Sequence, residues 1–236
     1  EDLAKKIFDK WNLDFAIIGK TTNSKNIELF FNNEQVANIP VNTLVENSPM
    51  YDRKWKKTKL PQKIKFDKKD FKKLKIVDVL KKILSSPNIC NKEWIWQQYD
   101  QTVMGDTIQK PGTDSGVVRI HSTNKAVATS VDSSAVYCYA HPQTGGKQVV
   151  CENWRNLISA GSKPIALTNC LNFGNPEKEK NMGEFVESIN GISEACKYLD
   201  YPVVSGNVSF YNETNNKNIK PTPIIGGVGL IDDIEK

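Results

Sequence analysis

The run Tyr201–Thr214 is the most informative stretch of the sequence, because small polar residues follow a short apolar segment directly. It contains Gly206, Asn207, Ser209 and Glu213. Asn, Ser and Glu oxygens suit a hard cation such as magnesium, and a glycine lets the backbone approach a ligand closely. The same residue types are also ordinary turn chemistry. A ligand site and a polar turn between strands therefore both remain open at this point.

Two further segments end in polar clusters, Thr129–Asp132 and Ala166–Asn169. If the three predicted strands are neighbours, Asp132, Asn169 and Asn207 would converge at one edge of a sheet. Oxygen donors gathered in this way suit magnesium together with a phosphate. The sequence has neither of the common glycine-rich phosphate-binding motifs, so a nucleotide would have to bind by a less familiar scheme.

A second candidate for anion binding is Gly145-Gly146-Lys147, which the pattern places just ahead of a helix. Helix N-termini attract anions, so Lys147 is a weaker candidate for a phosphate contact. A loop-to-helix junction with a solvent-facing lysine explains the same residues equally well. His121 and His141 have no partner at an informative spacing, and we interpret both as structural.

Composition restricts the class of protein. Of 32 Lys and Arg residues, 14 lie between Tyr51 and Lys82, against 4 of the 27 Asp and Glu residues. A solvated linker explains this basic stretch better than nucleic-acid binding, because no recognised binding module surrounds it. No apolar run is long enough to span a membrane. Five cysteines without a Cys-x-x-Cys pair favour free thiols in a reducing cytoplasm.

The periodicity of apolar residues predicts a mixture of helices and strands with both long and short connections, hence an α+β (mixed α/β) fold. We expect a small α/β piece over residues 1–50, a basic linker over 51–75 and a main domain over 76–236. Helices are predicted over Asp2–Lys10, Val41–Glu46, Leu74–Leu84, Asn91–Gln98, Gly146–Ala160 and Met182–Leu199. Strands are predicted over Phe15–Ile18, Ile27–Phe31, Val36–Ile39, Gly116–His121, Ala126–Val131, Pro164–Leu167, Val203–Val204 and Ile224–Leu230.

Taken together, the motifs resemble the phosphoribosylformylglycinamidine synthase family, in the large synthetase subunit of its short bacterial form. The stretches that carry the resemblance are Trp96–Asp100, Val103–Thr107, Tyr137–Pro142, Gly145–Gln148, Trp154–Leu157, Leu171–Pro176, Val203–Glu213, Pro221–Pro223 and Gly226–Gly229. Residues 1–55 also resemble that family, including Pro49–Arg53. The resemblance covers nearly the whole chain.

The resemblance implies an aminoimidazole ribonucleotide synthetase N-terminal-domain-like sheet with flanking helices, preceded by a remnant of a C-terminal α/β domain. It also implies part of an ATP-dependent ligase of de novo purine biosynthesis. Such enzymes convert formylglycinamide ribonucleotide (FGAR), ATP and glutamine-derived ammonia to formylglycinamidine ribonucleotide, ADP and phosphate. The amide oxygen is phosphorylated and then displaced by ammonia, with Mg²⁺ stabilising the charge on the moving phosphoryl group.

Carried over residue by residue, the resemblance assigns ATP contacts to Asn169 and Gly206, a Mg²⁺ contact to Asn207 and a substrate contact to Ser209. Asn169 stands where the family usually has an aspartate, and an amide cannot contribute its negative charge. Asn156 likewise replaces the aspartate of an Asp-x4-Gly-Ala-x-Pro signature, which here continues as Gly161–Pro164. The family's catalytic histidines lie in a domain outside this sequence, so no catalytic residue is assigned.

These expectations describe a piece of a longer protein that is inactive alone. Its partners would be FGAR, the remaining domains of the same polypeptide, and glutaminase and small accessory subunits. Neither nucleic acid nor a membrane is expected as a partner. A nucleotide-binding scaffold half without turnover is the alternative. Because the family's N-terminal domains pair across a barrel-like sheet, we also expect this domain to form a homodimer.

Overall fold

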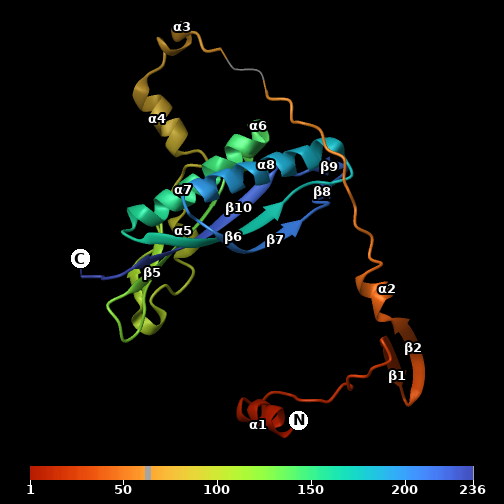
Figure 1. Ribbon diagram of the computed structural model, residues 1–236. Helices are drawn as coiled ribbons and strands as arrows, with labels where there is room; N and C mark the ends of the chain where they lie inside the picture. The colour runs from red at the N-terminus through yellow and green to blue at the C-terminus, as the bar shows by residue number, and fades with distance from the viewer. Residues whose placement is uncertain (62–64, 236) are drawn as a thin grey trace. The chain divides into compact units, whose positions relative to one another are not determined.

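The computed structural model describes residues 1–61 and 65–235. The described chain divides into two compact units, Glu1–Asp52 and Arg53–Lys236 (Figure 1). We describe each unit by itself, and the three sequence-based domain boundaries remain predictions. Within the described residues, no helix has the combination of length and apolar character that crossing a bilayer requires.

The first unit consists of α1 (Asp2–Lys10), β1 (Asn26–Phe31), β2 (Glu34–Pro40) and α2 (Val41–Val45). β1 and β2 form an antiparallel hairpin, and Asn32 and Asn33 turn it with φ angles of 49° and 67°, as the predicted Asn-Asn turn requires. The strand predicted over Phe15–Ile18 is wrong, because the structure has no strand there. No residue of Glu1–Asp52 is buried, so this unit has no core of its own.

The second unit is built on a six-stranded mixed sheet with the order β3-β4-β5-β10-β6-β7. β6 and β7 are parallel, and the other neighbouring pairs are antiparallel. A separate two-stranded hairpin follows β7. The bounds are β3 (Thr107–Gln109), β4 (Gly116–Arg119), β5 (Ala126–Ser133), β6 (Lys163–Asn172), β7 (Val203–Ser209), β8 (Glu213–Thr214), β9 (Lys217–Asn218) and β10 (Thr222–Ile231).

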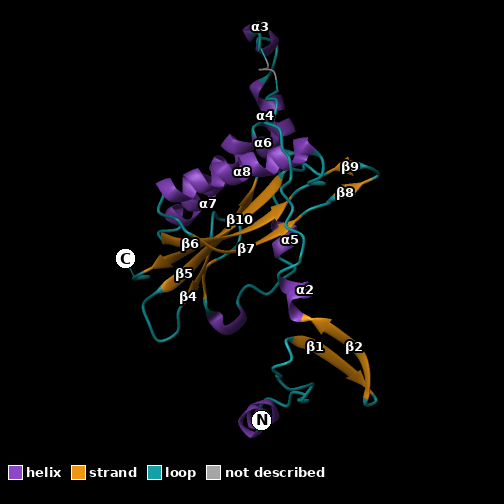
Figure 2. Ribbon diagram, turned by 45° about the vertical axis from the view of Figure 1, so that its right-hand side comes forward, coloured by secondary structure: helices purple, strands orange, loops and turns teal. Residues whose placement is uncertain are grey.

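Two long helices, α7 (Pro142–Ser159) and α8 (Glu179–Tyr198), lie on one face of this sheet (Figure 2). The core between them and the sheet includes Val149, Leu157, Ile192, Leu167 and Ile225. The predicted mixed fold with a sheet and flanking helices is confirmed. The remaining helices are α3 (Lys68–Phe71), α4 (Ile76–Leu84), α5 (Glu93–Trp96), the 3₁₀ helix η1 (Val103–Gly105) and α6 (Ala135–Ala140).

The close packing of α7 on α8 depends on glycines. A Cβ atom built on Gly146 would collide with the carbonyl oxygen of Ser188 in α8, and one on Gly191 would collide with that of Gln143 in α7. Gly145, Gly146 and Lys147 lie inside α7, which begins at Pro142. Their predicted position just ahead of a helix is wrong, because the helix predicted over Gly146–Ala160 began too late. The glycines are present because two backbones meet there.

The start of the second unit runs along α8. The backbone N–H of Lys56 donates to the carbonyl oxygen of Glu179 over 3.1 Å, and that of Thr58 donates to Glu187 Oε2 over 2.9 Å. This part of the predicted basic linker is thus fixed to the domain by backbone hydrogen bonds. The helix α3 also forms within residues 51–75, and residues 62–64 of that stretch lie outside the described residues.

Candidate functional site

The polar cluster after Val204 belongs to a strand. β7 continues to Ser209 and pairs in parallel with β6, which continues to Asn172. In the register of this pair, Asn169 lies beside Gly206 and Cys170 beside Asn207. The predicted strands were too short, because Ser-Gly-Asn and Thr-Asn favour turns locally while ladder hydrogen bonds to a neighbouring strand override that preference.

The face of β6 and β7 that points away from α7 and α8 carries several polar side chains among apolar ones. Ser205 Oγ lies 2.7 Å from Thr168 Oγ1, and Asn207 Nδ2 lies 3.9 Å from Cys170 Sγ. These four side chains border a shallow hollow of about 350 Å³. Its lining consists of Val131, Thr168, Asn169, Cys170, Ser205, Gly206, Asn207, Ile224 and Gly226. Gly206 and Asn207 are therefore accessible to a ligand, as a binding role requires.

Asn169 explains why residue 206 is a glycine. A Cβ atom on Gly206 would collide with Asn169 Oδ1, so the Asn169 side chain covers the backbone of β7 at this point. Asn169 also lines a second hollow of about 400 Å³ between the strands and the C-terminal half of α8. The two ATP-contact candidates thus lie side by side. Asn169 borders both hollows, and Gly206 borders the hollow around Asn207.

Asp132 lies on the opposite face of the sheet from Asn207. It shares a register row with Ile225 and Asn169 and points toward α7, where its carboxylate accepts hydrogen bonds from Asn153 Nδ2 (2.8 Å) and Asn156 Nδ2 (2.7 Å). The predicted convergence of Asp132, Asn169 and Asn207 at one edge is therefore wrong. β10 separates β5 from β6, and the pleat directs neighbouring residues to opposite faces.

A buried polar network surrounds Asp132 and was not predicted. Tyr201 donates its hydroxyl to Asn153 Oδ1 over 2.8 Å, and burial raises the pKa of Tyr201 well above its usual range. Asn153 is fully buried and donates to the Ser130 carbonyl oxygen over 2.9 Å. No sequence signal distinguishes Asn153 from a surface asparagine, because its partners come from distant segments. The network fixes α7 to the sheet.

The same network explains the altered signature at Asn156. Its amide donates to Asp132 Oδ1, so an aspartate at position 156 would bring two carboxylates within hydrogen-bonding distance. Like charges that close disfavour each other's ionised form. An amide at this position is compatible with Asp132, and the departure from the signature has a local structural cause.

Lys147 forms an ion pair with Glu194 of α8. The hydrogen bond from Lys147 is the main cause that lowers the pKa of the exposed Glu194 carboxyl. Lys147 is not among the residues that line the hollow.

The two histidines contact other residues of the domain. His121 Nε2 lies 2.8 Å from Asp106 Oδ2, and His141 Nδ1 caps α7 by accepting from the Thr144 N–H. Both histidines thus have contacts within the fold, and their interpretation as structural residues stays a prediction.

The donor set around Asn207 is suited to magnesium only in part. Amide and hydroxyl oxygens of Asn207, Ser205 and Thr168 are hard ligands, but all of them are neutral. Among the described residues, no group of three or more His, Cys, Asp or Glu side chains is placed to hold a metal ion. The arrangement therefore suits a cation that arrives with the negative charge of nucleotide phosphates, and not an independent metal site.

Residues 112–231, about half of the chain, match the family described as "AIR synthase related protein, N-terminal domain". The chain belongs to the AIR synthase related family. The matched range contains five of the six strands of the sheet, all but β3, together with α7 and α8. The sheet-and-helix domain described above is thus the family's N-terminal domain.

Curated relatives of this AIR synthase related chain extend well beyond it. It is 75% identical over 235 residues to the phosphoribosylformylglycinamidine synthase subunit PurL of Pelagibacter ubique. It is 48% identical over 237 residues to the subunit of the same name from Azorhizobium caulinodans. Each match covers 100% of this chain but 32% of the relative. The chain therefore spans about a third of the length of these relatives.

Solved structures give the same relationship at lower identity. T. maritima PurL complexed with ATP has a TM-score of 0.66 and 26% identity, covering 89% of this chain and 32% of that one. T. maritima PurL complexed with FGAR also has a TM-score of 0.66 and 26% identity, covering 88% of this chain and 31% of that one. The AIR synthase related fold is therefore shared with proteins that bind ATP and FGAR.

Proposed function

We propose that the chain is one part of an ATP-dependent phosphoribosylformylglycinamidine synthase, a C–N ligase of purine biosynthesis with glutamine as the source of ammonia. The observation that carries the proposal is the exposed hollow beside Gly206 and Asn207, at the parallel pair β6–β7. Ligands of mixed α/β sheets commonly bind near the carboxyl ends of parallel strands. The relatives that cover the whole chain carry this enzyme's name.

In this proposal each site residue has a distinct role. Gly206 lets ATP approach the backbone of β7, and Asn169 contacts the nucleotide beside it. Asn207 donates its amide oxygen to the Mg²⁺ that accompanies the nucleotide, and Ser209 contacts FGAR. Bound Mg²⁺ would supply neutralisation of phosphate charge. The chain's own residues hold and orient the ligands, and none of them transfers a proton or forms a covalent bond.

The proposal includes dependence on other protein parts. FGAR turnover would need the remaining domains of a polypeptide about three times as long, together with glutaminase and small accessory subunits, in the cytoplasm. The chain alone would bind Mg-nucleotide and be inactive. Asp132 and Lys147 have no direct part, because their charged atoms are held by Asn153, Asn156 and Glu194.

Calorimetry with Mg-ADP tests the nucleotide role. We expect the chain to bind Mg-ADP and Asn207→Ala to bind it about tenfold more weakly, because one ligand of the cation is lost. Asn190→Ala is the matched control, since Asn190 is exposed on α8. Binding that is unchanged in Asn207→Ala would reject the metal role. Turnover of FGAR by the chain alone would reject the claim of inactivity.

A nucleotide-binding scaffold without turnover is the second candidate, and the neutral Asn169 favours it. A neutral amide beside Gly206 contributes no charge to a cation that would stabilise a moving phosphoryl group, which suits a site that holds a nucleotide without turnover. Copurified ADP that does not exchange with labelled ATP would support the scaffold. Exchange of the bound nucleotide during turnover in a longer polypeptide would support a direct catalytic contribution.

We also propose that the chain forms homodimers through the edge strand β3, which lies at the opposite end of the sheet from β7. Ile108 on this strand is 43% exposed, and an edge strand favours association with a second chain. Sedimentation at high concentration should give a species of twice 26.6 kDa. Ile108→Lys should shift it to monomer, whereas Val136→Lys, at an exposed position on α6, should leave it unchanged. A monomer in the unsubstituted chain would reject the proposal.

A further inference from the structure

The chain turns sharply after β7, and one side chain organises that turn. The Asn212 amide nitrogen, Nδ2, lies 2.9 Å from the Ser209 carbonyl oxygen and 3.1 Å from Ser209 Oγ. It also lies 3.0 Å from the carbonyl oxygen of Phe173. Phe173 directly follows β6, so Asn212 joins the ends of the two parallel strands.

The direction of these hydrogen bonds matters for Ser209. A hydroxyl has one hydrogen to donate and can accept through its lone pairs. When Asn212 Nδ2 donates to Ser209 Oγ, the hydroxyl hydrogen remains available for an acceptor outside the turn. The internal alternative, Asn212 Oδ1, lies 3.4 Å from Ser209 Oγ, which is long for a hydroxyl hydrogen bond. The two hydrogens of Asn212 Nδ2 are shared among Ser209 Oγ and two carbonyl oxygens. Within this turn Ser209 thus has an acceptor only at a long distance, and its hydroxyl hydrogen can be donated outward.

We propose that Asn212 is a positioning residue that directs the Ser209 hydroxyl toward an oxygen of the phosphoribosyl substrate. This inference rests on the proposed function, in which Ser209 contacts FGAR. It adds a residue outside the strands, acting on the substrate through Ser209 and not by contact of its own. Asn212 should therefore affect the substrate more than the nucleotide, whose proposed contacts lie at Gly206 and Asn207.

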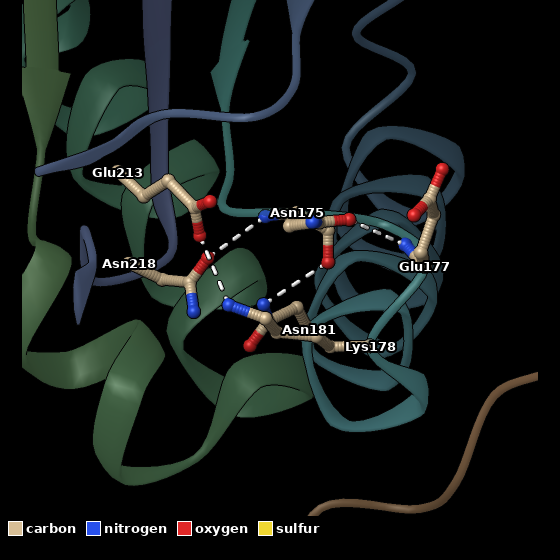
Figure 3. A network of polar contacts seen from close by, with 6 residues as sticks. All are labelled: Asn175, Glu177, Lys178, Asn181, Glu213 and Asn218. Atoms are coloured by element: carbon tan, nitrogen blue, oxygen red, sulfur yellow. Dashed lines mark hydrogen bonds and ion pairs between the residues drawn. The ribbon is translucent and has the colours of Figure 1, made fainter. Parts of the chain in front are cut away.

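Neighbouring loops hold Asn212 in place. Its carbonyl oxygen accepts a hydrogen bond of 3.0 Å from the Ile219 N–H, just after the β8–β9 hairpin. The hairpin is fastened to the loop before α8 by Asn218 Oδ1, which accepts from the Asn175 N–H over 2.9 Å (Figure 3). The Lys178–Glu213 ion pair of 3.0 Å joins the same two loops (Figure 3).

Aromatic packing supports the same pair of loops from α8. Phe185 makes edge contacts with Phe173 at 5.1 Å and with Phe210 at 5.0 Å between ring centroids. Phe173 and Phe210 precede the two loops, so their backbones stay anchored when the Asn212 side chain is shortened. Loss of the amide should then change the orientation of Ser209 more than the fold of the domain.

Calorimetry of the chain with FGAR, and separately with Mg-ADP, tests the inference. Asn212→Ala should weaken FGAR binding about tenfold, as expected for loss of one positioned hydrogen bond. It should change Mg-ADP binding by less than about twofold. Asn207→Ala should show the reverse selectivity, and Asn190→Ala should change neither. Ser209→Ala combined with Asn212→Ala should be no weaker than Ser209→Ala alone, because Asn212 acts through Ser209.

Amide hydrogen exchange gives a readout that needs no ligand. In Asn212→Ala, exchange should accelerate at Phe173 and Tyr211, whose N–H groups donate to Ser209 and Gly174 carbonyl oxygens. It should not change at Leu167, which donates to Pro202. Equal FGAR affinity in Asn212→Ala and the unsubstituted chain would overturn this inference alone. No binding of either ligand by the unsubstituted chain would overturn the proposed function, and the substrate role of Asn212 with it.

Discussion

The two faces of the six-stranded sheet are built for different purposes. The face toward α7 and α8 carries the buried side chains of Leu167 and Ile225 and the Asp132–Asn153 network. The opposite face carries Thr168, Cys170, Ser205 and Asn207 around a hollow. The same strands supply both faces through their pleat. The core therefore depends on one set of alternating residues, and Asn207 with the side chains around it belongs to the other set. Asn169 and Gly206 lie in the register row of Asp132, at the edge of the helix-covered face.

The rate at which cysteine thiols are alkylated should differ more between the two faces than any other property predicted below. Burial raises the pKa of Cys138 and of Cys196 to about 11, whereas Cys170 borders the hollow. Because the thiolate is the reactive form and both thiols are buried, Cys138 and Cys196 should react with iodoacetamide at pH 8 at least roughly tenfold more slowly than the partly exposed Cys170. Mass spectrometry of peptides from the modified chain measures each rate.

Bound nucleotide should protect Cys170 from alkylation, which gives a second test with the same measurement. Mg-ADP in the hollow should slow the reaction of Cys170 and leave that of Cys90, which is outside the hollow, unchanged. Equal rates at Cys196, which lies on α8 in the core, and Cys170 would contradict the assignment of the two faces. An unprotected Cys170 under conditions where calorimetry detects Mg-ADP binding would place the nucleotide elsewhere.

A methyl group between the helices should produce the largest loss of stability. Gly191→Ala places a Cβ atom against the Gln143 carbonyl oxygen, so α7 and α8 must move apart. We expect a decrease of about 3 kcal/mol in the free energy of unfolding, measured by chemical denaturation. The higher intrinsic helix propensity of alanine alone would increase the free energy of unfolding by about 1 kcal/mol. The sign of the change therefore decides between the two effects.

The matched control for this substitution is Gly116→Ala. The nearest atom to a Cβ on Gly116 is Thr129 Oγ1, at 3.9 Å, so the change should stay within about 0.5 kcal/mol. A Gly191→Ala variant as stable as Gly116→Ala would show that the helices are not held by this close approach.

The helix contacts also show how much of the fold could be predicted from the sequence. The helix predicted over Met182–Leu199 agrees with α8, because its apolar residues recur with the helical period and face one core. The prediction failed for Gly145-Gly146, since glycine indicates a loop unless a second backbone is known to pass nearby. The position of that second helix is a tertiary fact that no local pattern contains.

The candidate site was predictable in composition but not in arrangement. Gly206, Asn207 and Ser209 were identified from their residue types and from the resemblance, and the structure places Gly206 and Asn207 at the hollow. The grouping of Asp132 with Asn207 was wrong, because the register and the insertion of β10 between β5 and β6 depend on long-range pairing. The importance of Asn153 and Asn212 also depends on partners that are distant in sequence or lie across a turn.

Removing the Tyr201 hydroxyl should have an intermediate effect on the helix-covered face. Tyr201→Phe leaves Asn153 Oδ1 without the 2.8 Å hydrogen bond that it accepts in a fully buried position. The expected loss is about 2 kcal/mol in the free energy of unfolding. Tyr198→Phe is the control, because Tyr198 is 90% exposed. Equal stability of the two variants would mean that the network contributes little to holding α7.

The smallest expected effect concerns a buried carboxyl on α8. Glu184 is 6% exposed, and burial raises its pKa despite the opposing ion pair with Lys180 at 3.5 Å. A pKa that is higher in the folded than in the unfolded chain means that stability is lost as pH rises through the folded value. Glu184→Gln stays neutral, so its stability relative to the unsubstituted chain should increase from pH 4 to pH 7.

Chemical denaturation at each pH measures this difference in the free energy of unfolding. Glu152→Gln, at an exposed position on α7, controls for the loss of one negative charge. A relative stability of Glu184→Gln that falls over this range would show that the pairing with Lys180 outweighs the burial of the carboxyl group.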